Sequence, residues 1–182
     1  MKKYLLILYL FFFSNESYAE FKNDIIQNFK NTDNISFKFE QNINGKIERG
    51  NCTIQYPKKI FCNYDLDNGK VLISNGKTLI IKTNTSYYVY PLNKTPLNSI
   101  LDKDFLIDKI EYLEERIVGD KFINYTFNEN DNEINIFFDK TNYDLIGWQT
   151  LDIFQNLSIT FLSSIFKNQN LNKNLFILPK QN

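Results

Sequence analysis

Residues 56–101 read YPKKIFCNYDLDNGKVLISNGKTLIIKTNTSYYVYPLNKTPLNSIL and decide the fold of this chain. Ile60, Cys62 and Tyr64 alternate with more polar neighbours, which is typical of a β-strand with one buried face. Apolar runs on either side flank Asn75-Gly76, a dipeptide that tolerates positive φ and strongly predicts a hairpin turn. This stretch therefore predicts consecutive antiparallel strands joined by short turns.

The same stretch ends in a short helix. A strand at Tyr87–Tyr90 stops at Pro91, because proline has no N–H to donate to a neighbouring strand. Pro96 stands where a helix would begin, and Thr95 is the expected N-cap residue. The apolar face of this helix would consist of Leu97, Ile100 and Leu101.

The N-terminal part predicts one helix and a long hairpin. Apolar residues four apart over Glu20–Asn31 indicate an amphipathic helix. Strict alternation over Ile35–Ile43 indicates a half-buried strand, and a turn leads into a second strand at Lys46–Gln55. The apolar residues of the second strand change from odd to even positions at Gly50, which we interpret as a β-bulge with Ile47 facing inward.

The C-terminal part predicts a second set of antiparallel strands. The expected strands are Ile110–Val118, Phe122–Phe127, Glu133–Asp139, Leu145–Phe154 and Leu157–Leu162, with Leu175–Leu178 as a last strand or helical turn. Together with two helices they predict a mainly β (α+β) fold. A single curved antiparallel sheet would form an open, unclosed half β-barrel covered by short helices. Its concave face must be filled by the core, a helix or a ligand.

The composition excludes several classes of protein. The 21 basic and 21 acidic residues balance, so the chain lacks the charge of a nucleic-acid-binding protein. It has no histidine, the usual zinc ligand and general base. The acidic pairs Asp65 with Asp67 and Glu114 with Glu115 fall at predicted turns or on a solvent face, where we interpret them as solubilising charges. We therefore expect no enzyme, no metal and no cofactor.

Residues 1–19 have the pattern of a secretory signal peptide. Lys2-Lys3 forms the basic segment, Leu5–Phe13 the apolar segment, and Ser17-Tyr18-Ala19 places small residues at both cleavage-site positions. The apolar segment is about half the ~20 residues that a membrane-spanning helix needs. We therefore predict a periplasmic monomer with a single domain over residues 20–182.

Cys52 and Cys62 are the only cysteines, in a chain that we expect to be exported to a compartment where disulfides persist. Pairing about a turn centred on Pro57 places Ile54 opposite Ile60 and Cys52 opposite Cys62 in one hairpin. A redox-active pair would favour a C-x-x-C spacing, which is absent. The pattern predicts a structural disulfide.

The order of motifs in residues 56–101 resembles the periplasmic lipoprotein carrier family LolA, particularly its alphaproteobacterial branch. The resemblance rests on SNGKTL at Ser74–Leu79 combined with YPL and TPL at residues 90–97, since SNGKTL alone would suit any hairpin. It extends more weakly to Phe37–Gln41 and to Leu175-Phe176.

The resemblance implies a carrier that binds the acyl chains of lipoproteins in a hydrophobic cavity. Such a carrier shuttles them from an inner-membrane ABC exporter of the LolCDE type to an outer-membrane acceptor of the LolB type. In this family, a basic residue near the turn centred on Pro57 latches the helical lid. The usual arginine is here Tyr56, which leaves Lys58 and Lys59 as candidate latches. The implied cavity and lid residues are Phe29, Phe37, Phe39, Ile54, Ile60, Tyr64, Leu72, Leu97 and Ile100.

Alternatives stay open for both the residues and the function. Each of the nine apolar residues could be ordinary core. The nearest alternative function is another open-barrel lipid-binding envelope protein, either an outer-membrane acceptor or a stress sensor. An acceptor would normally carry a lipidated cysteine after the signal peptide, and Ala19-Glu20 offers none. A periplasmic hydrolase is least favoured, because the chain has no histidine.

Overall fold

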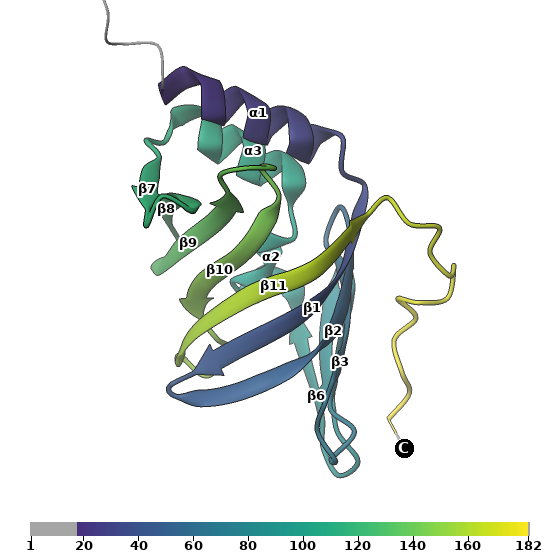
Figure 1. The fold of residues 1–182 in the computed structure, drawn as a ribbon. Coiled ribbons are helices and arrows are strands. Elements are labelled where there is room, and N and C mark those ends of the chain that lie inside the picture. The colour runs from purple at the N-terminus through teal and green to yellow at the C-terminus, as the bar shows by residue number, and fades with distance from the viewer. Residues whose placement is uncertain (1–17, 182) are drawn as a thin grey trace, which may run out of the picture.

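The computed structural model describes residues 18–181, which form one 11-stranded antiparallel sheet and three α-helices (Figure 1). The strands are β1 (Asn34–Ile43), β2 (Lys46–Gln55), β3 (Lys59–Tyr64), β4 (Val71–Asn75), β5 (Thr78–Lys82), β6 (Tyr87–Pro91), β7 (Arg116–Val118), β8 (Phe122–Glu129), β9 (Asn132–Asp139), β10 (Leu145–Leu151) and β11 (Leu157–Lys167). The helices are α1 (Tyr18–Lys30), α2 (Leu97–Ile100) and α3 (Lys103–Tyr112), and the 3-10 helix η1 (Leu92–Lys94) precedes α2. Apart from its last two residues, the predicted signal peptide (1–19) lies outside the described residues.

The sheet has the order β6-β5-β4-β3-β2-β1-β11-β10-β9-β8-β7. It consists of successive hairpins on either side of one long-range pair, β1 with β11. Its edges, β6 and β7, do not pair with each other, so the sheet curls without closing. This confirms the predicted open half-barrel. Within residues 18–181, no helix is both long enough and apolar enough to cross a membrane.

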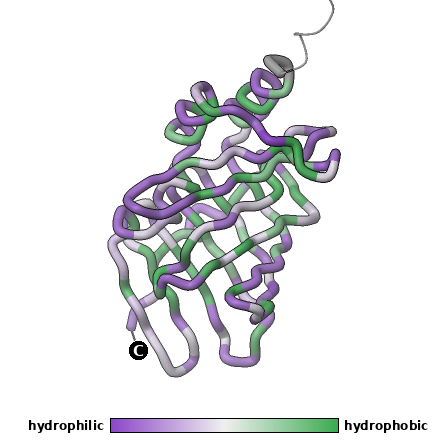
Figure 2. Tube along the Cα trace, turned by 90° about the vertical axis from the view of Figure 1, so that its left-hand side faces the viewer, coloured by the Kyte–Doolittle hydropathy of each residue, from purple (hydrophilic) through white to green (hydrophobic). Residues whose placement is uncertain are grey.

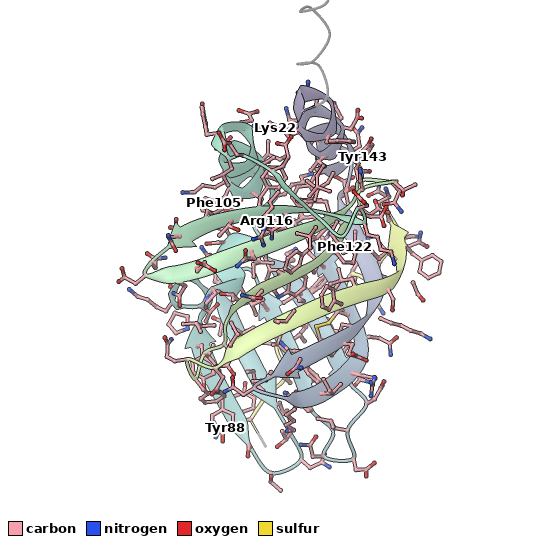
Figure 3. All side chains as sticks on the ribbon, turned by 60° about the vertical axis from the view of Figure 1, so that its left-hand side comes forward. Lys22, Tyr88, Phe105, Arg116, Phe122 and Tyr143 are labelled. Atoms are coloured by element: carbon pink, nitrogen blue, oxygen red, sulfur yellow. A yellow bond between two sulfur atoms is a disulfide. The ribbon has the colours of Figure 1, made fainter. Side chains whose placement is uncertain are left out.

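Helices α1 and α3 lie side by side at one end of the curved sheet (Figures 1 and 3). The Lys22 ammonium of α1 donates to the Leu113 carbonyl just after α3, with 2.7 Å between nitrogen and oxygen. The Phe29 ring of α1 packs edge-on against Phe138 of β9 and against Tyr56. These contacts place the main core between the helices and the concave face.

Alternating hydropathy explains why these segments form strands. Figure 2 shows hydrophobic and hydrophilic residues alternating along them, with hydrophilic residues at several turns. In β1, Phe37 and Phe39 are buried while Lys38 and Glu40 are exposed. One face of each strand therefore joins the core, and the other meets water.

The predicted β-bulge at Gly50 is wrong. β2 pairs with β1 along its whole length without a register shift. Ile47 faces outward and is 40% exposed, whereas Glu48 faces inward and is 3% exposed. Gly50 serves a close approach instead, because a Cβ there would lie 2.1 Å from the Asn63 carbonyl oxygen and 2.8 Å from the Phe39 ring.

The predicted strand at Ile110–Val118 is also wrong in its first part, because α3 continues to Tyr112 and the strand begins only at Arg116. The Asp102 carboxylate accepts a hydrogen bond from the Phe105 N–H at 3.3 Å and caps α3. Helix α3 then buries one face, which consists of Leu106, Ile107 and Ile110. Residues 18–181 therefore contain one α-helix more than predicted.

Smaller differences concern element ends. Thr95 does not cap α2, because its hydroxyl donates to the Leu92 carbonyl at 2.8 Å. β10 ends at Leu151, three residues earlier than predicted, and β11 continues to Lys167, five residues later. Residues 175–178 contain the end of a turn and no strand.

Candidate functional site

A cavity of about 370 Å³ opens on the concave face of the sheet. Inward side chains of β1–β5, β10 and β11 line it, together with Pro96 and Leu97 at the start of α2 and the turn after β10. The β1–β2 and β10–β11 turns meet at this end of the sheet, where the Asn44 side-chain amide donates to the Asn156 side-chain oxygen at 2.9 Å. The cavity therefore lies where strands far apart in sequence converge.

Five of the nine predicted cavity and lid residues line this space. They are Phe39, Ile60, Tyr64, Leu72 and Leu97. The other four, Phe29, Phe37, Ile54 and Ile100, do not line it and are buried in the core with at most 4% exposure. Strand alternation predicts which side chains face inward, but it does not show which part of that face the helices fill.

Sequence reasoning missed the wall contributed by β10 and β11. Trp148, Thr150 and Thr160 line the cavity opposite the residues from β3 to β5. β11 and its neighbour β10 reach this part of the sheet because β11 pairs with β1, matching Gln41 with Thr160 and Phe39 with Leu162. The sequence pattern of β11 even points the other way, because its apolar residues Ile159 and Phe161 are odd-numbered, whereas the structure buries Ser158 and Thr160.

Polar residues cross this part of the sheet in register. Gln41 of β1 lies between Glu48 of β2 and Thr160 of β11, and Ser158 of β11 lies opposite Thr150 of β10. The Gln41 amide donates to the Ser158 hydroxyl at 2.9 Å. We call these five residues the polar belt, and all five line the cavity.

Glu48 is the charged centre of the polar belt. Its carboxylate forms ion pairs with Lys70 and with Lys46, the latter at 2.9 Å. The Lys70 ammonium also lies 4.1 Å from the centroid of the Tyr64 ring. Burial favours a higher pKa for Glu48, but hydrogen bonds and charge from Lys70 and Lys46 outweigh it and hold the pKa below its usual value. The carboxylate therefore stays ionised at neutral pH.

Cys52 and Cys62 form a disulfide on the cavity wall, with their Cα atoms 4.1 Å apart. They lie directly opposite each other in the β2–β3 pair, next to Ile54 opposite Ile60. This confirms the predicted hairpin register and the predicted bond.

The family model described as the outer membrane lipoprotein carrier protein LolA matches residues 28–178. The chain belongs to the LolA family. None of the curated proteins matches this LolA-family chain.

Three solved structures are similar to this chain at low sequence identity. An uncharacterized conserved protein from Thermus thermophilus is 8% identical, with a TM-score of 0.53 over 89% of this LolA-family chain and 94% of that one. MucB is 9% identical, with a TM-score of 0.50 over 88% of this chain, which spans only 62% of MucB. A putative outer membrane lipoprotein-sorting protein domain from Vibrio parahaemolyticus is 11% identical, with a TM-score of 0.46 over 87% and 97% of the two chains.

Lys58 and Lys59 were the candidate latches of this LolA-family chain, and they have different surroundings. The Lys58 N–H donates to the Leu101 carbonyl at 2.8 Å, and its ammonium pairs with Asp102 at 3.0 Å. Lys58 thus joins the β2–β3 turn to the corner between α2 and α3. The Lys59 ammonium instead lies 5.9 Å from the ring centroid of Phe176 in the C-terminal segment.

Proposed function

We propose that this chain carries acylated lipoproteins across the periplasm, from an inner-membrane ABC exporter of the LolCDE type to an outer-membrane acceptor of the LolB type. Membership of the LolA family supports the class of cargo. The cavity carries the proposal. Packed cores contain few voids larger than a water molecule, so about 370 Å³ lined by Phe39, Leu72 and Leu97 suits a ligand site better than a core.

The energetics favour a protein carrier for such cargo. Transferring an acyl chain into water costs about 0.8 kcal/mol per CH₂, or ~12 kcal/mol for a chain of ~16 carbons. Inward apolar side chains such as Leu79 and Ile81 would replace the bilayer during transit. No covalent bond changes in this process, so carriage needs neither a catalytic residue nor a cofactor.

Helix α2 would act as a lid, and Lys58 as its latch. Leu97 faces the cavity from α2, and the next corner of the chain is held to the β2–β3 turn by Lys58. Moving α2 away from the sheet would break the ion pair with Asp102 and the hydrogen bond to Leu101. Lysine lacks the planar fork of arginine, so the latch would depend on one ammonium and one backbone N–H.

The test measures lipoprotein released from membranes into solution, and then its delivery to acceptor membranes. Leu72→Glu places an unpaired charge on the cavity floor, which costs several kcal/mol in an acyl-filled site, so uptake should fall about tenfold or more. Ile47→Glu is the matched control, because Ile47 faces outward from β2. Equal uptake by parent, variant and control would refute the cavity as the cargo site. Uptake without delivery would favour the alternative roles of acceptor or stress sensor.

A further inference from the structure

The cavity of this chain has an apolar part and a polar part. Leu72, Leu79, Ile81 and Leu97 supply apolar wall on the side of β4, β5 and α2. The polar belt supplies the wall formed by β2, β1, β11 and β10. A site that served only an alkyl chain would have no use for buried polar groups, because burying them costs free energy.

Two belt hydroxyls have unused hydrogen-bonding capacity. The Oγ1 atoms of Thr150 and Thr160 are buried and have no hydrogen-bond partner among the described residues. The two residues are 6% and 3% exposed, and both line the cavity. Leaving such a group unpaired costs about 1–3 kcal/mol. Rotation about χ1 exchanges the methyl and hydroxyl groups of threonine, so each hydroxyl can turn to a ligand acceptor in the cavity.

The charges in the cavity wall cancel. Lys46 and Lys70 are its two cations, and Glu48 and Asp152 are its two anions. Glu48 is paired with both lysines, and Asp152 accepts hydrogen bonds from the turn that follows β10. A ligand carboxylate would enter beside the ionised Glu48 and find both lysines engaged. An uncharged acceptor meets no such repulsion.

We propose that the polar belt binds the ester carbonyls of an acylglycerol group, so that the cavity selects acyl esters over free fatty acids. The carbonyls accept hydrogen bonds from Thr150 and Thr160, and the acyl chain runs toward Leu72 and Leu97. This inference rests on the proposed carrier function and adds the residues that determine ligand specificity. Glu48 is a specificity residue, because its charge excludes an anionic head group.

The first experiment titrates the protein near pH 7.5 with lauroylglycerol and with laurate, both below their micelle concentrations. Lauroylglycerol should bind about tenfold more tightly or better, because like charges close together disfavour the anion. Glu48→Gln leaves Lys46 and Lys70 unopposed and should reverse the preference in favour of laurate. Glu40→Gln is the matched control, because Glu40 lies on the outer face of β1 and pairs with Arg49. It should bind both probes like the parent.

The second experiment tests the hydroxyls with a probe that lacks the carbonyl, the dodecyl ether of glycerol. The parent should prefer the ester, and Thr150→Val combined with Thr160→Val should reduce that preference about threefold to tenfold. The same change should leave the free energy of unfolding equal or higher, because it removes two unpaired buried hydroxyls. Thr53→Val is the control on the other face of β2, where Thr53 pairs with Ser36.

The outcomes separate this inference from the carrier function. If no acyl probe binds, the carrier function itself is refuted. If all probes bind but the parent does not distinguish ester from acid, and Glu48→Gln and the threonine variants leave relative affinities unchanged, the polar belt has no role in selection. The expected result is ester preference in the parent, its reversal by Glu48→Gln and its reduction by the two valines.

Discussion

The two halves of the concave face differ in what covers them, although strands such as β2 run through both. In the helix-covered half, Phe29, Ile54 and Phe138 pack with at most 4% exposure. In the open half, Leu72 and the polar belt line a cavity of about 370 Å³. Along β2, the inward positions pass from Ile54 to Glu48 within six residues. Strand alternation decides which face is inward, but what covers that face decides whether it becomes core or site.

The largest expected contrast between the halves is in stability. Ile54→Ala should cost about 2–5 kcal/mol, because the fully buried side chain would leave a new cavity. Leu72→Ala should cost about 1 kcal/mol, because Leu72 already borders open space. Urea unfolding of both variants measures the difference. Equal losses would mean that the two halves are packed alike.

The disulfide between Cys52 and Cys62 borders the cavity, and reducing it should cause the next largest loss of stability. It closes a loop with a sequence separation of 10, so its reduction should cost about 2 kcal/mol, near the lower end for native disulfides. Thermal unfolding with and without reductant measures this. A variant with both cysteines replaced by alanine should be insensitive to reductant. A parent midpoint that stays unchanged after the bond is shown to be broken would contradict the prediction.

Removing the latch proposed at Lys58 should have a smaller energetic effect. The ion pair with Asp102 is partly exposed, so Lys58→Met should favour lid opening by less than about 1 kcal/mol, or roughly fivefold. The backbone N–H of residue 58 reports opening directly, because it donates to Leu101 in the closed state. Its hydrogen exchange should become faster in Lys58→Met and stay as in the parent in Lys59→Met. Unchanged exchange in both variants would argue against a latch.

The smallest expected effect is the pH dependence that Glu48 contributes. Its pKa is lowered in the folded state by Lys70 and Lys46, so its ionised form stabilises the fold. That contribution is fully present above the ordinary glutamate pKa of 4.5 and is lost as the pH falls through the lower folded pKa. Glu48→Gln should reduce the pH dependence of the free energy of unfolding in that acidic range. A variant whose pH profile has the parent's slope would show that another group is responsible.

Much of the fold could be predicted because its signals are local. Asn75-Gly76 gives a hairpin with Gly76 at a φ of 98°, and alternation at Ile60 and Cys62 predicts the buried face. Pairing across one turn also predicted the disulfide. Such patterns need only neighbouring residues.

The site was less predictable, because its parts meet through long-range pairing. Trp148 and Thr160 reach the cavity only once β11 pairs with β1. Glu48 was missed because the neighbouring Ile47 was predicted to face inward, and because one of its two partners, Lys70, lies 22 residues further along the chain. Helix α3 was missed although Asp102 precedes a helical spacing of Leu106 and Ile110, since the apolar residues after it were assigned to a strand.

The acyl-binding site can be mapped directly by identifying the residues that an acyl chain contacts. A lauroylglycerol probe with a photoreactive group at the end of its chain is bound and irradiated, and the modified residues are identified by mass spectrometry. We expect labelling in the open half, at Leu72, Ile81 and Leu97. Labelling at Phe29 and Ile54, or at the outward-facing Phe161, would contradict the central claim that the open half of the concave face is the acyl-binding site.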